Sequence, residues 1–87
     1  APFDHVICNP PFHTSRRADP ALGAAFIAAG ARLLKPSGTL WLVANRHLPY
    51  EKALESHFAE LRPLGEEAGY KLVAASRPRS NRSRPRR

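Results

Sequence analysis

Two short apolar runs stand out along the chain, at residues 6–8 and 39–43. The first run ends at Asn9-Pro10-Pro11, and the second is apolar at both odd and even positions. Apolar residues on both faces are typical of a parallel strand that helices cover on both sides. We therefore predict two buried strands, the first of which begins near Phe3 and ends at a rigid turn.

A helix is predicted between these two strands. Asp19 can cap its amino end, Pro20 suits its first position and Pro36-Ser37-Gly38 is typical of its end. Lys35 suits the carboxyl end of the helix and, like Arg32, should face solvent. Apolar and small residues recur at helical spacing in between, which predicts a buried face of Leu22, Phe26, Ala29, Gly30 and Leu33. The strand, helix and second strand would form one right-handed βαβ unit.

The rest of the chain predicts a short helix and a terminal hairpin. Tyr50, Leu54 and Phe58 are spaced by four, as on one face of a helix that begins near Pro49. Residues 59–64 and 70–75 have strand character and are joined by residues 65–69. Pro63 places the first hairpin strand at a sheet edge. The fold class is therefore α/β, and because the helices are few, we expect half of a larger sheet.

The basic charge is concentrated near the end of the chain. The net charge of the 87 residues is +7, and six arginines with no acid follow Ser76. Residues 1–76 hold 8 basic and 7 acidic residues, a net charge of +1. We therefore expect a folded body over residues 1–76 and a disordered Arg-rich tail over residues 77–87 that can bind polyanions.

The composition also narrows the class of protein. No apolar run approaches the ~20 residues that span a bilayer, and no signal peptide is evident, so we expect no membrane partner. Cys8 is the single cysteine. It excludes an intrachain disulfide and fits a cytoplasmic protein. The histidines lack partners at metal-ligand spacing, so no metal site is expected. Since the chain has no methionine, even at position 1, we expect a fragment or a processed product.

The segment Asn9-Pro10-Pro11-Phe12 carries the most chemical information. It follows a parallel strand, where open α/β sheets bind their ligands. The prolines fix the backbone and remove two N–H donors, so the Pro10 carbonyl stays free to accept a hydrogen bond beside the Asn9 side-chain carbonyl. Two fixed acceptors suit an exocyclic amino group, and Phe12 can stack on the ring that carries it. The segment holds no nucleophile or general base, which fits transfer of an already activated group.

These residues resemble the Asn-Pro-Pro-aromatic motif of class I S-adenosylmethionine-dependent amino-methyltransferases. With His13 added, and with residues 43–50 after the next strand, the chain is similar to the bacterial ribosomal RNA guanine-N2 methyltransferases of the methyltransferase small domain family. The resemblance extends from about Phe3 to Arg77. It implies a Rossmann-like seven-stranded sheet, of which this chain would supply strands four to seven, with the last strand antiparallel and inserted beside an edge strand.

The resemblance also implies the roles of individual residues. Asn9 and the Pro10 carbonyl would hold the target amine of a ribosomal RNA guanine, Pro11 would keep their backbone rigid, and Phe12 would pack on the base. His13 would contact the substrate or its phosphate. The segment Asn45-Arg46-His47 ends the next strand at the same edge and would line the substrate side. The cofactor would be S-adenosylmethionine, of whose site this chain holds only a part, at Asn9.

The sequence departs from the family in the cofactor half. The family places its cofactor on a Gly-rich turn after the first strand, with an acidic residue after the second, and the chain has neither. The chain would therefore be the catalytic half of the domain and is expected to be inactive alone. A non-catalytic RNA-binding remnant that uses the basic tail is one alternative. An amino-methyltransferase acting on DNA adenine or protein glutamine is another.

Smaller alternatives concern single residues. Arg46 could pair with an acid such as Glu51 instead of binding phosphate, and His13 could be an ordinary loop histidine. Trp41 and Cys8 are interpreted as core residues. His5 and His57 are interpreted as structural.

Overall fold

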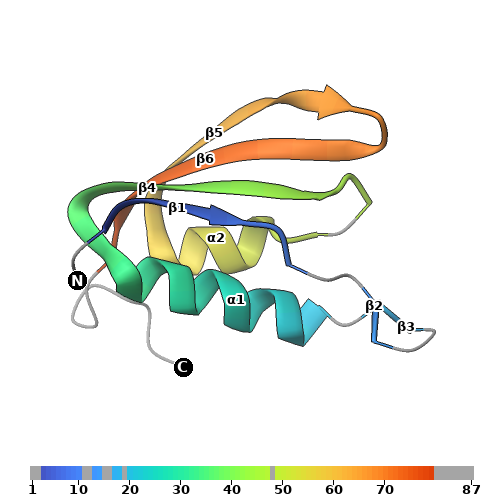
Figure 1. Ribbon diagram of the computed structural model, residues 1–87, viewed down its shortest axis with the longest axis horizontal. Helices are drawn as coiled ribbons and strands as arrows, with labels where there is room; N and C mark the ends of the chain where they lie inside the picture. The colour runs from blue at the N-terminus through green and yellow to red at the C-terminus, as the bar shows by residue number, and fades with distance from the viewer. Residues whose placement is uncertain (1–2, 11–12, 15–16, 19, 48, 80–87) are drawn as a thin grey trace.

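A computed structural model describes residues 3–10, 13–14, 17–18, 20–47 and 49–79 (Figure 1). Two helices and six strands follow one another along these residues. In chain order they are β1 (Phe3–Cys8), β2 (His13–Thr14), β3 (Arg17–Ala18), α1 (Pro20–Leu33), β4 (Leu34–Asn45), α2 (Glu51–His57), β5 (Phe58–Glu67) and β6 (Tyr70–Pro78). The predicted order of strand, helix, strand, helix and hairpin is confirmed.

The main sheet has the order β1-β4-β6-β5. β1 and β4 are parallel, with Cys8 opposite Leu42, whereas β6 is antiparallel to both β4 and β5. The last strand is thus inserted beside the edge strand β5, as the family resemblance implied. Pro63 lies on β5, where a missing N–H costs least, so its predicted edge position is confirmed.

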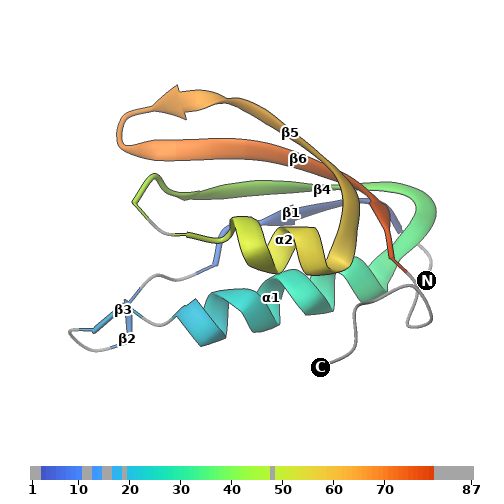
Figure 2. The same cartoon turned by 180° about the vertical axis from the view of Figure 1, so that it is seen from behind.

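Both helices pack on one face of this sheet, as seen in Figures 1 and 2. The core lies between the two helices and this face of the sheet. Its largest fully buried side chains are Ile27, Leu40, Leu42, Tyr50, Leu54 and Phe58. The predicted burial of Tyr50, Leu54 and Phe58 is therefore confirmed, but α2 contains only Leu54, since Tyr50 precedes the helix and Phe58 begins β5. Among the described residues, no helix covers the other face, in agreement with the expectation that the chain has too few helices for both faces. β1 is mostly exposed, so the prediction that it is a buried strand is wrong for the described residues.

Trp41 lies on the face of the sheet that the two helices leave open. It pairs with Ile7 in the sheet register, and Ile7 is 78% exposed. Trp41 itself is half-buried, and its Nε1 donates a hydrogen bond to Nδ1 of His5 at 3.2 Å. Trp41 is thus not part of the core, whereas His5 has the structural role that was expected.

α1 contacts the sheet through Ile27, Gly30 and Ala31 rather than through Phe26 and Leu33. Phe26 and Leu33, which were expected on the buried face, are each 45% exposed, whereas Ile27 and Ala31 are buried. A Cβ added at Gly30 would lie 2.6 Å from Cδ1 of Leu40. The helix therefore lies so close to β4 that side chains of the sheet fill the space between the two elements, and Phe26 faces solvent.

The elements also begin and end at positions that differ from the expectations. β4 begins at Leu34, so Lys35 lies in the strand and forms an ion pair with Asp4 at 3.6 Å instead of ending the helix. The hairpin turn is shorter than expected, since β5 continues to Glu67. The turn residues Ala68 and Gly69 have φ values of 55° and 85°, the left-handed geometry of tight two-residue hairpins.

The end of β6 lies beyond the expected boundary at residue 76. The strand runs to Pro78, which is opposite Phe58 in the register of β5. The first two residues of the expected tail therefore belong to the sheet, and the remaining prediction of a tail concerns residues beyond them. Among the described residues, no helix has the length and apolar character needed to cross a membrane.

Candidate active site

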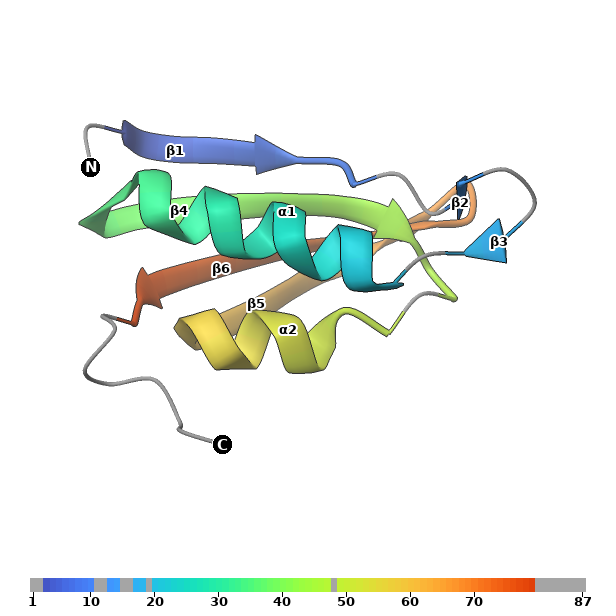
Figure 3. The same cartoon turned by 90° about the horizontal axis from the view of Figure 1, so that it is seen from below.

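The carboxyl ends of β1 and β4 lie at the same edge of the sheet, as Figure 3 shows. Asn9 and Pro10 follow β1 directly, and Asn45 is the last residue of β4. The side chain of Asn9 is exposed, whereas Pro10 is buried. The buried proline anchors the turn, so the exposed asparagine is presented from a fixed backbone. The sequence therefore placed these two strand ends correctly relative to one another.

Several expected site residues fall at or beyond the limit of the described structure. Pro11, Phe12 and the N-cap Asp19 lie outside the described residues, so their roles remain predictions. His13 belongs to β2, where its backbone is paired with Ala18 of β3. This small hairpin extends beyond the carboxyl edge of the main sheet (Figure 3), on the side where the substrate is expected.

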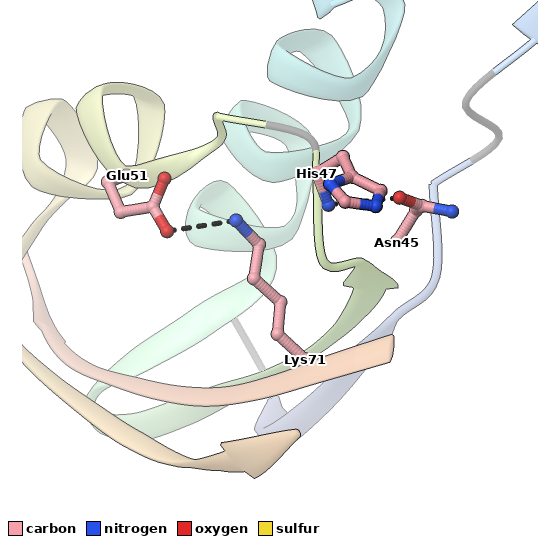
Figure 4. Close-up of polar contacts among 4 residues, drawn as sticks. All are labelled: Asn45, His47, Glu51 and Lys71. Atoms are coloured by element: carbon pink, nitrogen blue, oxygen red, sulfur yellow. Dashed lines mark hydrogen bonds and ion pairs between the residues drawn. The ribbon is translucent and has the colours of Figure 1, made fainter. Parts of the chain in front are cut away.

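The second group of expected residues forms a tight turn after β4. Oδ1 of Asn45 accepts a hydrogen bond from the backbone N–H of His47 at 3.0 Å, and the Arg46 N–H donates to the Gly69 carbonyl at 2.9 Å. Nε of Arg46 also donates to Nε2 of His47 at 3.5 Å. The Asn45 side chain thus acts as a local turn former. In Figure 4 its amide nitrogen points away from the turn, where it could serve as a hydrogen-bond donor.

An ion pair links the start of α2 to β6 next to this turn. Nζ of Lys71 lies 2.9 Å from Oε2 of Glu51 (Figure 4), and the Lys71 side chain is only 11% exposed. The hydrogen bond from Lys71 lowers the pKa of Glu51. Glu51 is therefore paired with Lys71 and not with Arg46, the alternative that the sequence had left open.

Sequence reasoning did not identify Lys71 as part of this region. Its register partner is Ala44, which is buried on the helix-covered face of the sheet. A lysine at such a position requires a partner, because a buried unpaired charge is costly. Side chains alternate between the two faces of a strand, and this alternation in the apolar residues after Lys71 is the one sequence signal that could have placed Lys71 on the buried face.

Cys8 ends β1 directly before Asn9 but has no reactive character. Its side chain is 5% exposed, and burial raises the pKa of the thiol. The thiolate is the nucleophilic form, so a raised pKa makes Cys8 inert at neutral pH. The expectation that it is a small buried hydrophobe is confirmed.

An apolar groove lies between β1 and α1 and includes Asn9 in its lining. It has a volume of about 480 Å³ and is lined mainly by Val6, Ile7, Cys8, Asn9, Phe26 and Leu33. Among the described strands, β1 is hydrogen-bonded to β4 and to no strand on its other side. An unpaired strand edge beside exposed apolar side chains is typical of a surface that packs against another structural element.

A parallel strand pair, an inserted antiparallel strand and an Asn-Pro turn at the first strand end define the C-terminal half of a class I methyltransferase sheet. The model of the methyltransferase small domain family matches residues 1–74. The chain belongs to this family.

The similar proteins include curated enzymes and a solved structure. The chain is 43% identical over 74 residues to ribosomal RNA small subunit methyltransferase C of Hahella chejuensis and 39% identical over 72 residues to that of Alcanivorax borkumensis. These matches cover 85% and 83% of the chain and 22% of each relative. The chain therefore spans about a fifth of the length of these relatives.

The structural match agrees with the sequence matches. A 16S rRNA N2 methyltransferase of T. thermophilus, solved in complex with AdoMet and guanosine, superposes with a TM-score of 0.71 at 36% identity. The match covers 86% of this chain and 20% of that chain. The expected fold, half of a methyltransferase sheet, is thereby confirmed.

Proposed function

We propose that this chain is the catalytic half of an S-adenosylmethionine-dependent methyltransferase that modifies the exocyclic amine of a guanine in ribosomal RNA. One observation carries the proposal: at the carboxyl end of β1, Asn9 is exposed and the neighbouring Pro10 is buried. The names of the relatives, and the AdoMet and guanosine bound to the T. thermophilus enzyme, support the cofactor and the substrate. The relatives named above support ribosomal RNA over DNA adenine or protein glutamine.

The residues at the strand end would bind and orient the substrate amine. The side-chain carbonyl of Asn9 and the backbone carbonyl of Pro10 would accept its two N–H bonds, with the purine held against Phe12. Positive charge develops on the nitrogen during transfer, and two fixed carbonyl dipoles stabilise that charge. Because S-adenosylmethionine supplies an already activated methyl group, positioning of the amine accounts for much of the rate.

The turn after β4 would form the other wall of the substrate site. The Asn45 amide would donate to the base or ribose, and Arg46 with His47 would contact a phosphate. The short contact between Arg46 and the Gly69 carbonyl holds this turn against the hairpin, which fixes the wall. His13, from the small hairpin beyond β1, would contact the same substrate.

The cofactor does not fit within this chain alone. The chain lacks the Gly-rich turn and the acidic residue that the family uses, and Asn9 is the one residue proposed to contact the cofactor. We infer that a cofactor-binding half completes the sheet at β1 and fills the apolar groove beside it. The chain by itself would then be inactive. A cytoplasmic location is part of the same proposal.

Replacement of Asn9 in a complete protein that contains this chain tests the proposal. Asn9→Ala should lower methyl transfer to ribosomal RNA by roughly 10²-fold or more, because one of two fixed acceptors is lost from the transition state. Cofactor binding and the circular dichroism spectrum should be unchanged. Asn81→Ala, outside the family-matched residues, is the matched control and should retain full activity. Undiminished turnover of the Asn9 variant would exclude its assigned role. Absence of methyl transfer by the unaltered complete protein would favour the non-catalytic RNA-binding alternative.

A further inference from the structure

The turn proposed as a wall of the substrate site belongs to a short connection between β4 and α2. This connection follows Ala44 of β4 and precedes Glu51, the first residue of α2. It contains Asn45, Arg46 and His47, the three residues proposed to contact the RNA. The positions of their side chains therefore depend on how the two ends of the connection are held.

Lys71 of β6 meets both ends of this connection. Its backbone lies opposite Ala44 in the sheet register, directly before the connection. Its Nζ lies 2.9 Å from Oε2 of Glu51, directly after the connection (Figure 4). Gly69, two residues before Lys71, accepts a hydrogen bond from the Arg46 N–H at 2.9 Å. One end of the β5–β6 hairpin thus holds the connection at its start, within its turn and at its end.

The ion pair is suited to this task because its lysine is shielded from water. The Lys71 side chain is 11% exposed. It lines a cavity of about 250 Å³ together with the apolar side chains of Leu54, Leu61 and Val73. An apolar surrounding strengthens a charge-assisted hydrogen bond and makes the lysine costly to leave unpaired. The pair therefore favours one position of the start of α2 relative to β6.

We propose that Lys71 is a positioning residue of the substrate site, which acts through Glu51 to hold the turn at residues 45–47 in the position that binds RNA. The proposal rests on the proposed function, in which this turn forms a wall of the substrate site. Lys71 itself contacts no substrate, since its charge is paired with Glu51 on the helix-covered face of the sheet. Fixing both ends of the connection lowers the conformational entropy that the turn loses when RNA binds.

Replacement of Lys71 in a complete protein that contains this chain tests the proposal. Lys71→Met keeps an apolar stem and removes the charge. It should weaken the binding of a fluorescently labelled fragment of small subunit ribosomal RNA, measured without methyl donor, by roughly two- to fivefold, the range for a partly exposed ion pair. The kcat at saturating RNA should be unchanged, because the lost binding is common to ground state and transition state. Lys71→Arg keeps the charge and should retain the wild-type affinity.

Amide hydrogen exchange in the same protein gives a readout that needs neither RNA nor catalysis. The N–H groups of Arg46 and His47 donate to the Gly69 carbonyl and to Oδ1 of Asn45. Both should exchange faster in the Lys71→Met variant, because the turn opens more often. Unchanged exchange would overturn the proposal. Faster exchange with unchanged RNA affinity would also overturn it, since the turn would then play no part in substrate binding.

Two further variants separate action through Glu51 from a general loss of stability. Glu51→Gln in the Lys71→Met background should weaken RNA binding no further, and an additive loss would contradict the proposal. The lysine is removed first because Glu66 lies opposite it in β5 and lines the same cavity, and so offers a second carboxylate when Glu51 is changed. Glu60→Gln breaks the ion pair with Arg77 at the opposite end of the sheet, and it should leave RNA affinity and exchange at the turn unchanged.

The Asn9→Ala variant distinguishes failure of this proposal from failure of the proposed function. It should lower kcat and leave exchange at the turn unchanged. If Asn9→Ala retains full turnover while Lys71→Met weakens RNA binding and speeds exchange, the role of Asn9 fails and that of Lys71 stands. If Asn9→Ala loses turnover while Lys71→Met keeps the wild-type RNA affinity, the role of Asn9 stands and that of Lys71 fails.

Discussion

The two faces of the main sheet differ in how completely their side chains are packed. On the helix-covered face, Leu40, Leu42 and Ala44 are at most 1% exposed. On the open face, Ile7 is 78% exposed and Leu72 is 37% exposed. The same strands thus carry a finished core on one side and unpacked apolar residues on the other. The comparison supports the proposal that the open face packs against elements outside this chain.

Truncation of one residue from each face should give the largest difference. Leu42→Ala is expected to lower the free energy of unfolding by about 2–5 kcal/mol, because it leaves a cavity between β4 and the helices. Ile7→Ala should change it by less than about 0.5 kcal/mol in this chain, since the side chain is already in water. Urea unfolding followed by circular dichroism measures both values.

The complete protein provides the control for this pair of variants. There the Ile7→Ala variant should become costlier, because the proposed cofactor half would cover β1. The Leu42→Ala cost should stay the same. If Ile7→Ala costs equally little in both proteins, the open edge of β1 is not an interface with the rest of the domain.

A second difference lies within α1, between small residues that face the core and small residues that face solvent. Gly23 faces the ring of buried Tyr50, and a Cβ at this position would overlap the ring. Gly23→Val should therefore destabilise the chain by roughly 1–3 kcal/mol or more, despite the gain in helix propensity. Ala25→Val, on the exposed side of the same helix, should cost only a few tenths of a kcal/mol. Thermal unfolding compares the two, and equal costs would contradict the close approach of α1 to Tyr50.

This helix shows where sequence reasoning succeeded and where it failed. Helical spacing identified the helix, but it assigned large Phe26 and Leu33 to the core in place of Ile27 and Ala31. Both stripes have helical periodicity, and the choice between them depends on how closely the helix approaches β4. That distance is set by Leu40 and Tyr50, which are remote in sequence. Tertiary contacts therefore determine which face of α1 is buried, because the local sequence pattern fits both faces.

The candidate site was predictable to the extent that it depends on local chemistry. Asn9 and Pro10 were recognisable because two prolines after an apolar strand restrict the backbone whatever surrounds them. Lys71 was not recognisable, since its partner Glu51 is 20 residues away and meets it through the antiparallel pairing of β6 with β4. Likewise, the apolar neighbours of Trp41 in the strand predict a core residue, because the local sequence does not show which face of the sheet the helices leave open.

The Glu51–Lys71 pair should give the smallest of these effects and the one that depends on pH. Lys71 lowers the pKa of Glu51 in the folded chain, so the unfolded chain binds more protons around the ordinary carboxyl value of ~4.3. The stabilisation is therefore present above that pH and is lost as the pH falls through the lower folded value. Because the Glu51 side chain is 57% exposed, solvent screening limits its worth to about 0.5–1 kcal/mol.

Glu51→Gln isolates this contribution. The variant should lose that stability at neutral pH and should converge with the wild-type chain in acid, where Glu51 is protonated in both states. Glu55→Gln, an exposed change on the same helix, is the matched control and should leave the pH dependence near that of the wild-type chain. Urea midpoints measured from about pH 7 to pH 3 give both curves. If the Glu51→Gln and Glu55→Gln curves coincide, the ion pair does not hold α2 on β6, and the helix-covered face is stabilised by its apolar contacts.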